Sequence, residues 1–309
     1  MKSPWTNVYG VARTLLAVGT LLTLLSNHSR TLFYPAIHGT IESPTTLVTF
    51  SLFGLLRHHL ELARFLAIAG LLVIASGWRP RWTALLHWWI SWSFSMTCIP
   101  ADGGDQVAHV LSLLLVPIAL TDPRRWHWAD PSPISSLSQI ILARIAMSAV
   151  WVVRLQGAVI YFNAAVGKFA VPEWMNGTAF YYWVLDPRIG VATRYHDWAL
   201  ALLRPPFVVA FLSWAPILIE LALCFTLAMS SDNKLRKPLF VLGLIFHSGN
   251  VIFFGLVSFF FSMAAVLVVM TRPVEEPFPF RLVKAWLGRI RETSIDAAQR
   301  LALRGGGAG

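Results

Sequence analysis

The sequence predicts an all-α integral membrane protein, a bundle of about eight transmembrane helices with further helices at the membrane interface. Hydrophobic residues make up 56% of the 309 residues, and charged residues only 13%. A soluble domain carries about 25% charged residues. Several apolar runs approach the ~20 residues that cross a bilayer core. Too few polar segments remain to cover a water-soluble core of this size.

The expected spans follow one another along nearly the whole chain. They are Val8–Ser26, Leu60–Ser76, Thr83–Ile99, Asp105–Thr121, Gln139–Phe162, Phe207–Ser230, Pro238–Phe253 and Gly255–Thr271. The first has no clear small-residue cleavage site after it and is expected to be a signal anchor. As a single helix, residues 238–270 would be about 50 Å long, too long for one crossing. We therefore expect a break near residues 247–250 or at Gly255.

Three further segments are expected at the membrane surface. Residues 46–56 are apolar but too short to span, which favours an interfacial or re-entrant helix. Residues 174–203 are rich in aromatic and Arg side chains, typical of the outer interface. Residues 1–272 are thus expected to form the transmembrane domain, and residues 273–309 a cytoplasmic tail. Within this tail, residues 281–304 have the pattern of a basic amphipathic helix.

The formal net charge of +10 comes mostly from Lys and Arg in short loops between spans and in the tail. This distribution marks cytoplasmic loops, and it predicts that both termini are cytoplasmic. Anionic lipid is the expected partner of this charge, and no nucleic acid is expected. Cys98 and Cys224 are expected near opposite ends of their helices, too far apart for a disulfide.

Lys168 is the first candidate for chemistry. It ends a long apolar helix at the predicted outer edge of the membrane, where an ionisable group is costly. Gly167 before it lets other helices approach closely, and the polar Asn163 lies about one turn earlier. A lysine in an apolar site can act as a base near neutral pH. The alternative is a lysine that only anchors the helix end, with Trp174 at the lipid–water boundary.

Asp105 is the second candidate, because it opens the fourth span. His109 follows four residues later on the same helical face. Such a pair could hold a proton, orient a substrate or ligate a metal. A third strong ligand is not evident, so no metal site is predicted. The alternative role of Asp105 is a helix-start acid favoured by the helix dipole.

His247 and Asn250 are spaced for one face in the outer half of the seventh span. A helix–helix contact is the alternative role for such a histidine. Asp105, Lys168 and His247 come from separate spans, yet the predicted topology sets all three toward the external side. We therefore expect an enzyme-like polar cavity there, with Lys168, His247 and Asp105 as catalytic candidates. Its expected lining residues are His109, Asn163, Asn250 and Trp174.

Arg154 and Glu220 lie deeper, in the fifth and sixth spans. We expect them to be structural charges that pair with each other, because an unpaired charge inside a membrane is expensive. Arg144 is the alternative partner of Glu220. No nucleotide-binding loop, Gly-x-Ser-x-Gly turn or zinc-protease motif is present, which disfavours ATP-driven transport and serine hydrolysis.

Residues 161–177 resemble the signature of the HTTM domain, the membrane domain shared by vitamin K-dependent γ-carboxylase and bacterial relatives. The signature reads Tyr-Phe-x-Ala-Gly-x-x-Lys-Leu, then Trp and Gly. This chain has Tyr161-Phe-Asn-Ala-Ala-Val-Gly-Lys-Phe169, then Trp174 and Gly177. The stretch Phe246-His-Ser-Gly-Asn250 is similar to a second carboxylase motif. The resemblance implies that Lys168 is a candidate for the base and that the ligand is a quinone, a lipid-like molecule or an exported peptide. The chain lacks the large luminal domain, and Gly167 replaces a second lysine, which argues against glutamate carboxylation.

Residues 6–25 resemble the start of a narrower group, the sporulation-delaying protein B family. Its members are bacterial membrane proteins needed to mature a secreted peptide toxin. The resemblance implies a bacterial cell membrane location, a secreted peptide precursor as partner, and a companion maturation protein. The leading hypothesis is a toxin-maturation protein with Lys168 in an enzyme-like outer cavity. The alternatives are a non-catalytic scaffold or immunity-type partner of the toxin precursor, and a transporter.

Overall fold

The computed structural model describes residues 2–33, 46–99, 102–131 and 133–279. The chain divides into two compact units, residues 1–276 and 277–309, and the second is described only at residues 277–279. The basic helix expected at residues 281–304 lies outside the described residues. The predicted boundary between a membrane domain and a cytoplasmic tail stays a prediction.

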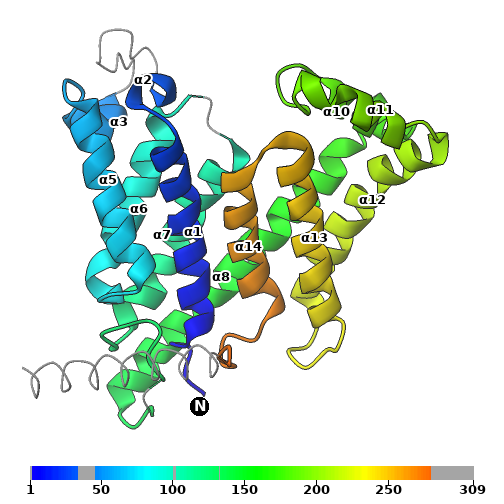
Figure 1. Cartoon of the computed structure of the whole chain (residues 1–309). Coiled ribbons are helices and arrows are strands. Elements are labelled where there is room, and N and C mark those ends of the chain that lie inside the picture. Colours follow the sequence, from blue (N-terminus) through cyan, green and yellow to red (C-terminus); the bar gives the residue numbers. More distant parts are fainter. Residues whose placement is uncertain (1, 34–45, 100–101, 132, 280–309) are drawn as a thin grey trace, which may run out of the picture. The chain divides into compact units, whose positions relative to one another are not determined.

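The regular elements of the described residues are helices, apart from isolated β-bridges between Phe33 and Cys98 and between Trp78 and Trp126. The long helices are α1 (Asn7–Ser26), α5 (Leu60–Ser76), α6 (Pro80–Thr97), α7 (Gly103–Thr121), α8 (Leu137–Lys168), α12 (Pro206–Cys224), α13 (Arg236–Phe254) and α14 (Val257–Thr271) (Figure 1). The short ones are α2 (Ser29–Leu32), α3 (Thr46–Thr49), α4 (Leu52–Leu55), α9 (Pro172–Met175), α10 (Ala179–Leu185) and α11 (His196–Leu202), with 3₁₀ turns η2 (Thr193–Tyr195) and η3 (Phe225–Ala228).

Within the described ranges, 5 helices are long and apolar enough to cross a membrane. They are α1, α7, α8, α12 together with η3, and α13. Helices α5, α6 and α14 coincide with predicted spans but are not among them, and α5 and α14 have only 17 and 15 residues. The all-helical prediction is thus confirmed for the described residues, and five of their helices have the length and composition to cross a membrane, whereas the count of about eight crossings stays a prediction.

Local sequence signals set the ends of the helix that carries Lys168. At the start of α8, Ser136 and Gln139 form a capping box, in which each side chain accepts from the backbone N–H of the other residue. The helix runs for 32 residues to Lys168. At 1.5 Å per residue it is about 48 Å long. It is therefore longer than a hydrocarbon core of ~30 Å.

The long apolar run after Pro238 is divided at Gly255, one of the two expected positions. Gly255 has a φ of 68°, in the left-handed region that favours glycine. Its backbone N–H donates to the carbonyl of Val251 at 2.9 Å, which closes the end of α13. Helix α14 then begins at Val257.

Helix α1 packs against α5, α7 and α14 (Figure 1). Because the long helices alternate in direction, α1, α6, α8 and α13 end where α5, α7, α12 and α14 begin; we call this the Lys168 end. Gly104 lets α7 approach α14 there, since a Cβ atom on Gly104 would lie 2.5 Å from the Cα of Phe259. Burial is uneven: 61% of the apolar window of α1 is buried, against 22% for α12 and 11% for α13.

The surface segments are built from short helices. Residues 46–56 form two short helices, α3 and α4, in place of one, because Ser51 interrupts them and caps α4 by accepting from the Gly54 N–H at 2.9 Å. Residues 172–202 form α9, α10 and α11, which we call the cap. Helices α9 and α10 of the cap pack on α12, and Phe180 of α10 contacts Phe253 of α13.

Candidate functional site

The Lys168 ammonium is paired with the Glu220 carboxylate. Its Nζ donates to Oε1 at 2.8 Å and to Oε2 at 2.7 Å, and also to the backbone carbonyl of Ala164 at 3.1 Å. The two side chains are only 17% and 7% exposed. Water therefore screens this pair poorly, and each group depends on the other for its stability.

The pair lies beneath the cap. Trp174 of α9 is largely buried, and the Lys168 Nζ lies 5.1 Å from the centre of its ring, a cation–π contact. Trp174 packs with Ala165, Ala179 and Ile217 in a small apolar cluster. Glu220 is fourteen residues into α12, about 21 Å along that helix. The end of α8 therefore meets α12 well below the start of α12, and the cap fills the space above.

A second buried contact joins α8 to α13. The Tyr161 hydroxyl and His247 Nε2 are 3.0 Å apart, and both residues are 1% exposed. His247 Nδ1 is buried and has no hydrogen-bond partner among the described residues. If the Tyr161 hydroxyl donates, Nδ1 carries the hydrogen and is a donor without an acceptor. The Glu220 carboxylate is close enough to act electrostatically on the Tyr161 hydroxyl, which connects this contact to the Lys168 pair.

Asp105 lies in a different local network. It forms a capping box with Asp102, whose Oδ1 accepts from the Asp105 N–H at 2.9 Å. The Ser258 hydroxyl donates to Asp102 Oδ2 at 2.6 Å. Phe259, the next residue of α14, packs its ring against His247 at 5.5 Å between ring centres. The structure thus places Asp105 and His247 on either side of the α14 start, without a direct contact between them.

The other expected lining residues are only partly at this site. Asn163 is exposed on α8, and His109 and Asn250 are half-buried. Trp174 is the one of the four that contacts Lys168 in the described structure. Within the described residues, no three His, Cys, Asp or Glu side chains are grouped closely enough to hold a metal ion.

The expected pairing of Arg154 with Glu220 is wrong. The Arg154 guanidinium donates from Nε to the Val269 carbonyl at 3.0 Å and from Nη2 to the Arg272 carbonyl at 3.1 Å. These carbonyls belong to the C-terminal end of α14, which carries a partial negative charge that a cation stabilises. Arg154 therefore has a capping role, and Glu220 belongs to Lys168.

The pairing restricts what Lys168 can do. An ammonium that donates to a carboxylate has no lone pair and cannot accept a proton. Lys168 can act as a base only after it has passed a proton to Glu220, so the two side chains form one proton-holding unit. The same unit can also serve as a polar anchor for a ligand that displaces one of the Lys168 hydrogen bonds.

Sequence reasoning missed two partners, Glu220 for Lys168 and Tyr161 for His247. Glu220 is the only charged residue of α12, and Lys168 needs a counter-charge, so the rule that buried charges are paired could have joined them. The sequence analysis did not join them, because it placed Lys168 at the outer edge of the membrane and Glu220 deeper. Tyr161 opens the signature segment, but no spacing rule linked it to α13.

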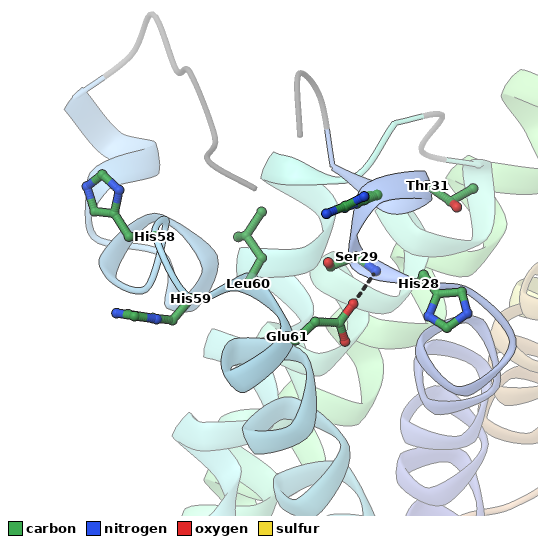
Figure 2. Close-up of a pocket in the computed structure, with 8 residues that line it drawn as sticks. His28, Ser29, Thr31, His58, His59, Leu60 and Glu61 are labelled. Atoms are coloured by element: carbon green, nitrogen blue, oxygen red, sulfur yellow. Dashed lines mark hydrogen bonds between the residues drawn. The ribbon is translucent and has the colours of Figure 1, made fainter. Parts of the chain in front are cut away.

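The structure also has a pocket at the Lys168 end, away from these residues. It lies between α2 and the start of α5, and Figure 2 shows its side chains. None of the predicted site residues lines it.

The comparisons with known proteins cover nearly the whole chain. It is 36% identical over 290 residues to the uncharacterized protein YitO of Bacillus subtilis (strain 168), spanning 93% of this chain and 92% of that protein. It is 33% identical over 275 residues to the sporulation-delaying protein SdpB of the same organism, spanning 89% of this chain and 84% of that protein. The chain belongs to the SdpB family. Membership in this family and several apolar helices together indicate a multi-pass membrane protein.

No family model matches the chain, so the resemblance to the HTTM domain stays a prediction. No solved structure matches it either.

Proposed function

We propose that this protein acts in the maturation of a secreted peptide toxin and that the Lys168–Glu220 unit is its working site. The observation that carries the proposal is the buried ion pair beneath Trp174, at the end of the signature segment, in a chain of the SdpB family. Buried charge is costly to maintain in a membrane, and charges kept there commonly mark functional sites. The partners would be the peptide precursor and a companion maturation protein.

In this proposal Lys168 and Glu220 hold and exchange a proton, and the Tyr161–His247 contact lies about two turns earlier along α8. If the Tyr161 hydroxyl donates to Nε2, the hydrogen on His247 Nδ1 would suit an acceptor such as the carbonyl oxygen of a quinone. Bound there, a quinone would supply redox chemistry. The chain's own contribution would be to hold the ligand by His247 and Tyr161, to exclude water with Trp174, and to move a proton at Lys168 Nζ. Asp105 would support the site through the α14 start.

A second candidate function is a non-catalytic scaffold or immunity-type partner of the toxin precursor. It is favoured by one observation: every hydrogen of the Lys168 ammonium is already used by Glu220 and Ala164, as expected of a purely structural pair. In that case the pair only stabilises the junction of α8, α12 and the cap.

The test compares producer cells that carry the wild-type protein, Lys168→Met, or Lys168→Met/Glu220→Leu. Arg144→Gln is the matched control, because Arg144 is an exposed cation on the same helix. Protein levels are matched by immunoblot, and secreted peptide is measured by mass spectrometry. The working-site proposal predicts loss of the mature peptide mass in both Lys168 variants. Normal mature peptide from a stable double variant would contradict it and support the scaffold function.

A further inference from the structure

A pocket lined mostly by residues of polar or charged type lies at the Lys168 end between α2 and the start of α5 (Figure 2). Its volume is about 600 Å³. It is lined by His28, Ser29, Arg30, Thr31, His58, His59, Leu60 and Glu61. Leu60 anchors this lining, because it belongs with Leu32 to the buried apolar cluster between α1, α5 and α6.

The carboxylate in the lining is already neutralised. Glu61 Oε1 accepts from the backbone N–H of Ser29 at 3.0 Å, and Oε2 accepts from Arg64 Nε at 2.8 Å. Arg64 also donates from Nη1 to the Leu24 carbonyl at 2.6 Å and to that of Asn27 at 3.2 Å. Glu61 and Arg64 thus tie α1, α2 and α5 together, and the Arg64 guanidinium offsets the charge of the Glu61 carboxylate.

Each of the remaining polar side chains of the lining can donate a hydrogen bond, and only Arg30 carries a fixed positive charge. Arg30, His28 and His59 are exposed, and their side chains make no hydrogen bond or ion pair with other described residues. The Arg57 guanidinium, beside the pocket, donates to His58 Nε2 at 3.2 Å. Because that nitrogen accepts, the hydrogen of a neutral His58 ring lies on Nδ1. The pocket therefore presents donors and positive charge, the chemistry that recognises a phosphate or carboxylate.

An exposed apolar stripe begins at the same place and runs along α5. It consists of Leu62, Phe65, Leu66, Leu72 and Val73, which are 41–59% exposed. Their spacing puts them on one helical face. The stripe extends from residue 62 to residue 73, about 16 Å along the helix. It therefore runs along the bundle axis, away from the surface, in the direction that lipid acyl chains take.

We propose that this pocket binds the headgroup of an anionic phospholipid, whose acyl chains lie along the α5 stripe. The occupant must combine an anionic group with a long apolar part that enters the membrane, and a phospholipid has both. An acidic peptide would satisfy the donors but would leave the α5 stripe unused. The lipid would brace α2 against α5 at the Lys168 end, independently of the proposed Lys168 chemistry.

The test is native mass spectrometry of the full-length protein in detergent, titrated with phosphatidylglycerol or with phosphatidylcholine. The variant is Arg30→Gln/His59→Gln. The matched control is Arg188→Gln, which removes an exposed arginine paired only with Asp186, outside the pocket. We expect wild type and control to prefer phosphatidylglycerol. The Arg30→Gln/His59→Gln variant should bind phosphatidylglycerol about five-fold more weakly, because it loses the Arg30 charge and one basic residue at an anionic membrane surface has about that effect.

Several outcomes would overturn the proposal. Equal binding of both lipids would contradict recognition by charge. Equal phosphatidylglycerol binding by the variant and the control would show that the lipid does not bind in this pocket. Competition by inorganic phosphate at the same concentration as the lipid would indicate a free-phosphate site. If a poly-glutamate peptide displaces bound phosphatidylglycerol and excess phosphatidylcholine does not, the pocket is a peptide site.

Discussion

Breaking the Lys168–Glu220 pair should reveal how strongly its two members depend on each other. Lys168→Met leaves a buried carboxylate without its partner, and Glu220→Leu leaves a buried ammonium. The double variant replaces both with apolar side chains of comparable size. Each single variant should be much less stable than the wild type, while the double variant should recover most of the lost stability.

The magnitude follows from the geometry. At 2.7 Å and an effective dielectric constant of about 20, the attraction is about 6 kcal/mol before desolvation is subtracted. Removing one partner of a buried pair costs about 3–5 kcal/mol, because the other charge stays buried. Replacing both partners is often nearly neutral. We therefore expect each single variant to lose about 3 kcal/mol and the pair to show a coupling energy above ~2 kcal/mol.

The assay is thermal unfolding of the three variants and the wild type in the same detergent. For a chain of 309 residues, 1 kcal/mol corresponds to about 1.5 °C in Tm. Single variants within ~1 kcal/mol of the wild type would refute the reasoning, as would additive losses in the double variant. Small single losses would mean that water reaches the pair and screens it, whereas additive losses would mean that the two side chains do not stabilise each other.

Three further predictions concern other parts of the bundle. Gly104→Ala should lower the Tm, because its Cβ would collide with the Phe259 backbone, whereas Gly167→Ala, with open space around it, should be neutral or raise the Tm slightly; equal effects would contradict the close packing. Tyr161→Phe should cost about 1–3 kcal/mol in the same assay, because it leaves both nitrogens of the buried His247 ring unsatisfied; a loss below ~0.5 kcal/mol would argue against that contact. Burial, followed by nearby cationic groups, holds the pKa of His127 well below 6.5. Below about pH 6.5 the unfolded chain therefore takes up a proton that the folded chain does not. The free energy of unfolding of the wild type should fall below this pH by up to ~1.4 kcal/mol per pH unit relative to His127→Gln. Parallel stability–pH profiles of the two proteins would exclude this role of His127.

Much of the fold could be predicted from apolar run length alone. The long helices coincide with the predicted spans, because backbone groups in an apolar setting must be satisfied within the helix. The division at Gly255 was also predictable, since only glycine readily adopts its backbone conformation. The interruption of residues 46–56 was not predicted, because it depends on one capping serine, Ser51.

The site was less predictable than the fold. The sequence singled out Lys168 and His247, but it assigned Glu220 to Arg154. The assignment failed because Lys168 was expected at the outer edge of the membrane and Glu220 deeper, next to Arg154. In the structure, α12 begins well beyond the end of α8, and the cap covers Lys168. Arg154 instead bonds to backbone carbonyls, and such partners leave no trace in residue type or spacing.

The sparse protein packing of α12 and α13 affects the medium that surrounds the Lys168–Glu220 pair. Only 22% of the apolar window of α12 and 11% of that of α13 is buried within the protein, so on that side we expect lipid tails to lie near the Lys168–Glu220 junction. The dielectric felt by the two charges is therefore partly a property of the bilayer. Exchanging lipid for detergent, or a thick membrane for a thin one, changes the chemistry of this junction without altering a single side chain.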